Sequence, residues 1–258
     1  MSDYNRFANA RSGAGVAQSA TGAIDQGLRS YMLGVYNYMT LGLGVTGLVA
    51  FVAYKAAVVE SATGQILGLT DFGAAIYTSI LRYVVIFAPL AVVIGFSAGR
   101  NSLSVGAARG VFLLFAALIG LSMSTIFVVY THGSIFRVFF ETAAAFGALS
   151  LYGYTTKRDL SAMGSFMIMG LFGIIIASVV NIFLQSSGLQ WALSIVAIGV
   201  FAGLTAWDTQ RLKNDYIYGY ASQGGDVAER AAITGALSLY LNFINLFTLL
   251  LQLLGQRD

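Results

Sequence analysis

Seven long apolar stretches dominate this sequence, and each is long enough to cross a lipid bilayer as a helix. The hydrocarbon core of a bilayer is about 30 Å thick, which requires roughly 20 helical residues. The stretches cover residues 31–54, 77–98, 110–130, 134–153, 163–184, 189–209 and 232–254. We therefore predict an all-α integral membrane protein: a seven-helix transmembrane domain over residues 31–256, in contact with the lipid bilayer and preceded by a flexible polar tail over residues 1–30.

The residue types that are rare in this chain exclude several classes of protein. Charged residues make up 10% of it, against about 25% in soluble domains, so no soluble module is expected. The absence of cysteine excludes disulfides and thiolate metal sites, and the single histidine excludes multi-histidine metal sites. No Ser/His, His/Glu or paired-aspartate motif has catalytic spacing. We expect no enzyme activity, no catalytic residues, no cofactor and no nucleic-acid partner.

Positive charges sort to one side of the predicted bundle. Most of the 14 Lys and Arg residues lie in the tail or in the connections after the second, fourth and sixth stretches; the exceptions are Lys55, Arg82, Arg137 and Arg257. Because positive residues favour the cytoplasmic side, we expect a cytoplasmic N-terminus and an external C-terminus. Short loops and the lack of a targeting segment favour a bacterial inner (plasma) membrane.

The last apolar stretch carries polar residues on one helical face. Ser238, Asn242 and Asn245 follow the spacing i, i+4 and i+7. A lipid-facing stripe with two amides would be costly, so this face should look inward. The stripe has two interpretations: hydrogen bonding between helices, or the lining of a polar pathway.

Two carboxylates lie inside apolar stretches. Asp208 ends the sixth stretch and has Arg211 three residues later, on the same helical face. It is either an interfacial charge with a local partner or a titratable group at the bottom of a polar pathway. Glu141 follows Arg137 by four residues, which has two interpretations: a local ion pair, or a role in an outer vestibule.

Glycines recur at four-residue spacing in three places. The pairs are Gly95 and Gly99, Gly106 and Gly110, and Gly199 and Gly203. Small residues let membrane helices approach closely, so these pairs predict packing between helices of one chain, or else dimerisation.

Three segments together carry a resemblance to a known family. They are ETAAAFGALSLYGYTTKRDLSAMG at 141–164, WDTQRLKNDY at 207–216 and GALSLYLNFINLF at 235–247. On these segments the chain resembles the transmembrane Bax inhibitor motif family, also called the Bax inhibitor-1 family, and is similar to its compact bacterial members. The resemblance covers residues 29–256.

The resemblance implies a fold in which six helices surround a central seventh. It also implies a calcium leak across the membrane, controlled by pH through two intramembrane aspartates. Asp208, after Trp207, matches the first aspartate, but Asn242 stands at the position of the second. Arg100 matches a family cation at the inner end of the second span.

The amide at position 242 changes what the resemblance implies. Two adjacent carboxylates share a proton, and that coupling is lost when one becomes an amide. Asn242 can still donate a hydrogen bond to Asp208, but a steep pH switch and a two-carboxylate cation site are put in doubt. Calcium prefers six to eight oxygen ligands, so the core predicts no firm metal site and only transient calcium at Asp208.

Two functions follow as hypotheses. The first is a pH-influenced calcium leak channel or regulator of ion homeostasis, with a pathway through Asp208, Asn242, Arg100, Arg211, Ser238 and Asn245. The alternative is a non-conducting regulator that binds another membrane protein, such as a quality-control protease. A secondary transporter would need broken helices and internal repeats, and neither is evident.

Overall fold

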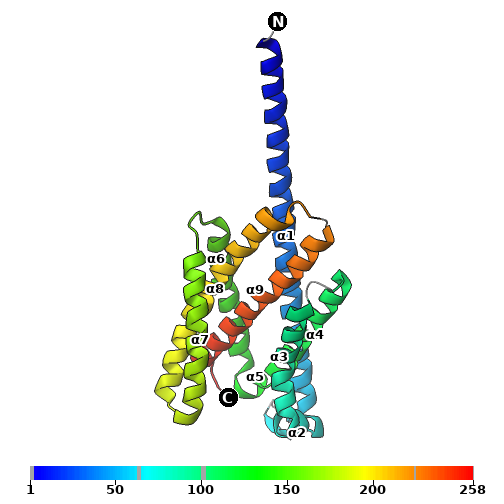
Figure 1. The fold of residues 1–258 in the computed structure, drawn as a ribbon. Helices are drawn as coiled ribbons and strands as arrows, with labels where there is room; N and C mark the ends of the chain where they lie inside the picture. The colour runs from blue at the N-terminus through cyan, green and yellow to red at the C-terminus, as the bar shows by residue number, and fades with distance from the viewer. Residues whose placement is uncertain (1–2, 63–64, 100–102, 224, 258) are drawn as a thin grey trace.

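The protein is a bundle of long helices (Figure 1), to which a small hairpin is added. The computed structural model describes residues 3–62, 65–99, 103–223 and 225–257. The elements, in chain order, are α1 (Asp3–Ala57), β1 (Val58–Glu60), β2 (Ile66–Leu69), α2 (Asp71–Tyr77), α3 (Leu81–Gly99), α4 (Val105–Met123), α5 (Ile126–Val129), α6 (His132–Thr155), α7 (Ser161–Leu184), α8 (Ser187–Asp215), the π-helical turn η1 (Tyr216–Tyr220) and α9 (Gly225–Leu254).

Six helices of the described chain have the length and hydropathy to cross a bilayer. They are Ile24–Ala57, Val105–Val129, His132–Thr155, Ser161–Leu184, Ser187–Tyr220 and Gly225–Leu254. A seventh span exists if α2 and α3, which meet at a bend of 61°, count as one. The all-α membrane fold is therefore confirmed, with six spans that stand alone and one that depends on the bent pair.

The second predicted span, 77–98, begins later than its hydropathy indicated. The helix breaks at residues 78–80, between α2 and α3. The hydroxyl of Thr78 donates to the carbonyl of Ala74 at 2.7 Å, and the hydroxyl of Ser79 accepts from the backbone N–H of Leu81 at 3.1 Å. Such local bonds compete with helix continuation, which explains the break.

α9 is the central helix. It packs against α1, α4, α6 and α8, while α3 packs on α4 and α7 packs on α8. The two chain ends lie at opposite ends of the bundle (Figure 1). We call the end where α1 enters the N-terminal side; the hairpin and the C-terminus are on the opposite side.

α1 starts at Asp3 and extends beyond the bundle as one helix (Figure 1). The tail that the sequence predicted, residues 1–30, thus has helical geometry from Asp3 onward. Helical geometry does not determine whether a segment moves, so its flexibility and the domain boundary at residue 30 stay predictions.

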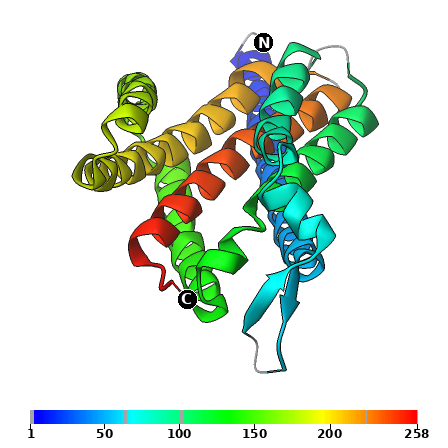
Figure 2. The ribbon, with the colours of Figure 1, turned by 90° about the horizontal axis from the view of Figure 1, so that it is seen from below.

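A short hairpin follows α1, and the sequence analysis did not predict it. β1 and β2 pair antiparallel, with Val58 opposite Leu69 and an irregularity after Val59. The hairpin projects from the edge of the bundle (Figure 2). Glu60 ties it to the end of α1, because its carboxylate accepts hydrogen bonds from Tyr54 and Lys55.

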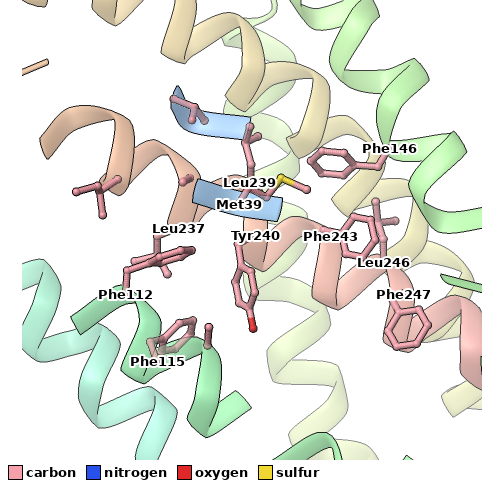
Figure 3. Packing of buried hydrophobic residues seen from close by; sticks show 14 of the residues in the cluster. Met39, Phe112, Phe115, Phe146, Leu237, Leu239, Tyr240, Phe243, Leu246 and Phe247 are labelled. Atoms are coloured by element: carbon pink, nitrogen blue, oxygen red, sulfur yellow. The ribbon is translucent and has the colours of Figure 1, made fainter. Parts of the chain in front are cut away.

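Aromatic side chains of α9 form the centre of the core (Figure 3). Phe112 and Phe115 of α4 meet the ring of Tyr240 edge-on, each with centroids 5.8 Å apart. The hydroxyl of Thr46 on α1 donates to the carbonyl of Ala116 at 2.9 Å and lies 2.6 Å from the Tyr240 hydroxyl. Tyr240 is therefore the donor to Thr46, and one polar network joins α1, α4 and α9.

Two of the three predicted glycine pairs make no close helix contact, and the tight contacts fall mostly at other glycines. An added Cβ would meet nothing within 4 Å at Gly95, Gly106 or Gly110. At Gly153 it would lie 2.1 Å from the carbonyl oxygen of Ala206 on α8, and at Gly120 2.6 Å from that of Thr46 on α1. In the third pair, Gly203 abuts the side chain of Met167, whereas Gly199 meets nothing.

Candidate functional site around Asp208

Asp208 is a buried carboxylate at the contact between α8 and α9. Asp208 exposes 6% of its surface. The side-chain amide of Asn242 on α9 donates to its Oδ2 at 2.7 Å, and a guanidinium nitrogen of Arg211 lies 2.6 Å from its Oδ1. A buried carboxylate is stable only when it is paired and hydrogen-bonded, and these contacts supply both. The ion pair and the amide contact that the sequence predicted are both present.

The two contacts of Asp208 differ in kind. The side-chain amide of Asn242 makes an aligned hydrogen bond to Oδ2, whereas Oδ1 accepts no aligned hydrogen bond from the described residues. Arg211 is therefore held to Oδ1 by charge. Its guanidinium also lies over the ring of Trp207, 4.7 Å from the centroid, and its side chain is 36% exposed. Arg211 is the more easily displaced of the two partners.

A cavity of about 650 Å³ lies beside this ion pair on the N-terminal side. Its walls come from α1, α3, α8, η1 and α9, and both Arg211 and Ser238 line it. Arg230 and Asp215 add one charge of each sign. The hydroxyl of Tyr31, which also lines the cavity, is buried with no hydrogen-bond partner among the described residues. Arg211, which both lines this polar cavity and pairs with Asp208, therefore links the two.

The remaining predicted residues are not all at this site. Asn245 is half-buried, and its amide donates to the carbonyl of Leu241 in its own helix at 2.8 Å. Glu141 lies on α6, 48% exposed, with a guanidinium nitrogen of Arg137 3.7 Å away. Arg100 lies outside the described residues. The structure thus brings together Asp208, Arg211 and Asn242 beside Ser238.

The sequence analysis missed a second polar cluster on the N-terminal side. Arg109 of α4 lies 2.6 Å from the carboxylate of Glu229 on α9 and donates to the hydroxyl of Tyr38 on α1 at 2.8 Å. Tyr38 in turn donates to Glu229 at 2.7 Å. The sequence predicts no site role for Arg109 or Glu229, because their partners lie on helices distant in sequence.

The described residues contain no group of three or more His, Cys, Asp or Glu side chains placed to hold a metal ion. Asp208 is bonded to the side-chain amide of Asn242, which offers one further oxygen. Transient calcium at Asp208 remains a prediction.

Comparison with known proteins places this architecture in a family. Residues 28–258 match the family model described as inhibitor of apoptosis-promoting Bax1. The chain is 46% identical to the inner membrane protein YbhL of Escherichia coli (strain K12) over 90% of its own length and 93% of that relative. It is 44% identical to the uncharacterized protein RP147 of Rickettsia prowazekii over 90% of its length and 92% of the relative. An uncharacterized protein of Caulobacter vibrioides is 42% identical over 99% of this chain and 98% of the relative. The resemblance carried by the three sequence segments is thus confirmed, and this chain belongs to the Bax inhibitor-1 family.

Proposed function

We propose that this protein is a pH-influenced calcium leak channel or regulator of ion homeostasis, with Asp208 as its titratable element. The observation that supports the proposal is the position of Asp208. It is buried and paired with Asn242 and with Arg211, and Arg211 lines a neighbouring polar cavity. An ionisable group inside a membrane protein is costly, and such groups usually belong to ion or proton pathways.

In this proposal the ion pair closes the pathway. Arg211 lines the cavity and pairs with Asp208, and Asn242 holds the carboxylate against α9. Protonation of Asp208 removes its charge and the attraction to Arg211. The guanidinium can then turn into the cavity, where Asp215 offers another carboxylate. The polar face of α9 at Ser238 and Asn242 would then be open to a hydrated cation.

The amide at position 242 sets how the pathway responds to pH. A carboxylate there would share a proton with Asp208, and such a pair titrates in two separate steps. With Asn242, one carboxylate titrates alone. We therefore expect calcium flux to follow a single titration step in the natural sequence.

Calcium flux into liposomes containing the purified protein tests the proposal at several pH values. Asp208→Asn should mimic low pH and remove most of the pH dependence, while Asn242→Asp should replace the single titration step with two. Asn245→Asp is a matched control, because its amide bonds within α9 and not to Asp208. Identical flux profiles for the wild type, Asp208→Asn and Asn242→Asp would refute the proposal and leave Asp208 a structural anchor.

A second candidate function is a non-conducting regulator that binds another membrane protein, such as a protease. The observation that favours it is the N-terminal part of α1, which extends beyond the bundle and offers a surface outside the membrane domain (Figure 1). Absence of flux at every pH, together with loss of a co-purifying protein after deletion of residues 1–23, would support this function over the first.

We further propose a bacterial inner membrane location with a cytoplasmic N-terminus. The name of the Escherichia coli relative supports the membrane, and the uneven distribution of Lys and Arg supports the orientation. Reporter fusions at both ends test this placement, and activity of a cytoplasmic reporter at the C-terminus would contradict it.

A further inference from the structure

Two cavities lie end to end between α1 and α6, away from the Asp208 site. The one on the N-terminal side has a volume of about 590 Å³ and is lined by α1 residues between 29 and 39 and α6 residues between 146 and 154. The other, about 420 Å³, continues along α1 from 40 to 51 and along α6 from 135 to 140. We refer to these two cavities together as the α1/α6 groove.

The wall and floor of this groove are apolar and aromatic. Met32 and Met39 of α1 face Phe146 of α6 across the cavity on the N-terminal side. The ring of Phe243 on α9 lies 5.5 Å from that of Phe146 and lines the second cavity (Figure 3). Methionine side chains are flexible and adapt to irregular partners. This surface suits a flexible hydrocarbon chain.

The groove opens sideways toward the surrounding lipid. Leu33 and Leu151 line it on either side and are 53% and 63% exposed. An occupant therefore enters from the bilayer without passing through the bundle.

The N-terminal end of the groove is positively charged. Arg29 lines this end, is exposed, and makes no ion pair with any described residue, including Asp25 one turn earlier. Tyr154 lines the same end, and its carbonyl accepts a hydrogen bond from Lys213 at 2.8 Å. Lys157 follows three residues later and is exposed. An apolar groove with cations at one end is complementary to an anionic amphiphile.

The length of the cavity matches one leaflet. From Arg29 to Met39 the helix rises about 15 Å, at 1.5 Å per residue. Half of a hydrocarbon core of about 30 Å is the same depth. A chain anchored by its headgroup at Arg29 would reach the level of Met39 and Phe146 at the middle of the bilayer.

We propose that the α1/α6 groove binds one anionic phospholipid from the leaflet on the N-terminal side. Its phosphate pairs with Arg29, and one acyl chain lies against Met32, Met39 and Phe146. The proposal does not rest on ion conduction, and its test does not measure flux.

Replacing a glycine that lines the groove with a larger residue tests the proposal, because the new side chain fills the groove. Gly147 lines the cavity, and a Cβ added there would meet nothing within 4 Å. Gly147→Leu should therefore fold and occupy the space of the acyl chain. Gly173→Leu is the matched control, because Gly173 lies on the exposed face of α7 with equally open surroundings.

The experiment reconstitutes each variant with equal amounts of phosphatidylglycerol and phosphatidylethanolamine, extracts it with a mild detergent, and measures retained lipid by native mass spectrometry. Wild type and Gly173→Leu should retain one phosphatidylglycerol, and Gly147→Leu should lose it. Arg29→Gln, which leaves the packing intact, should lower the preference for phosphatidylglycerol by about tenfold, a factor equal to ~1.4 kcal/mol. Equal retention by all four proteins would identify only surface lipid and overturn the proposal. Detection of a protein dimer without bound phosphatidylglycerol would also overturn the proposal.

Discussion

Replacing Gly153 by alanine is expected to push α6 and α8 apart. The new Cβ would lie 2.1 Å from the carbonyl oxygen of Ala206 and 3.0 Å from its Cα. An ordinary C···O contact is about 3.3–3.6 Å long, so the helices must separate locally by more than about 1 Å. The obstacle is backbone, which cannot rotate away. Since Asp208 is two residues beyond Ala206 on α8, the displacement also reaches the candidate site.

The expected cost follows from two opposing effects. Overpacking that shifts the backbone costs about 1–3 kcal/mol, and occasionally more. Alanine gains up to about 1 kcal/mol over glycine in helix propensity, which offsets part of that cost. We expect Gly153→Ala to lower the free energy of unfolding by up to about 3 kcal/mol and to be about 1–3 kcal/mol less stable than Gly147→Ala. Gly147→Ala on the same helix gains the propensity without a contact, and should be neutral or stabilising by up to about 1 kcal/mol.

Unfolding in mixed micelles with increasing sodium dodecyl sulfate measures the difference. Both tryptophans, Trp191 and Trp207, lie on α8, so their fluorescence reports on the helix that moves. Equal unfolding midpoints for Gly153→Ala and Gly147→Ala would show that the helices adjust without cost and would refute the reasoning.

Three further predictions concern polar contacts. Gln210→Ala should lower the free energy of unfolding by about 1–3 kcal/mol. The buried side-chain amide of Gln210 accepts from the backbone N–H of Leu160 at 2.8 Å and donates to the carbonyl of Arg158 at 2.7 Å, just before α7. An unchanged unfolding midpoint would contradict this. The Lys55 ammonium chiefly holds the pKa of Glu60 below its ordinary value. The stabilisation by Glu60 should therefore be complete above the ordinary glutamate pKa of about 4.3 and be lost as pH falls through the lower folded value. Thermal unfolding of the wild type and Glu60→Gln from pH 3 to 7 measures it, and a difference that grows toward acid would have the wrong sign. A double-mutant cycle for Arg109→Gln and Glu229→Gln should give a weak coupling that high salt abolishes, since both side chains are partly exposed; a coupling that persists in high salt would contradict this.

The Asp208 cluster was largely predictable from the sequence. Helical spacing places Arg211 on the same face as Asp208, and this pair needs no information on tertiary structure. The family resemblance supplied the second helix and with it Asn242. Tyr31 and Arg230, which line the neighbouring cavity, could not be found in this way, because α1 and α9 meet there only in the folded protein.

Helix packing was the less predictable part. Spacing identifies glycines that share a face, but not whether another helix covers that face. Gly106 and Gly110 share a face that is open, whereas Gly120 and Gly153, in no predicted pair, carry close contacts. The hairpin was missed because three- and four-residue strands, at 58–60 and 66–69, are too short for a periodic pattern.

The placement of α7 has a consequence for how this protein can diverge in evolution. α7 packs on α8, and Gly164 is the one buried residue of this helix. Lipid does not distinguish one aliphatic side chain from another, so most of α7 should accept any apolar substitution. Gly164 should not, since a Cβ there would lie 2.3 Å from the Trp207 ring, beside Asp208. A saturation library of α7 should therefore tolerate apolar substitutions along the helix but not at Gly164 in its first turn. Selection on this span should act mainly at the end that contacts Trp207.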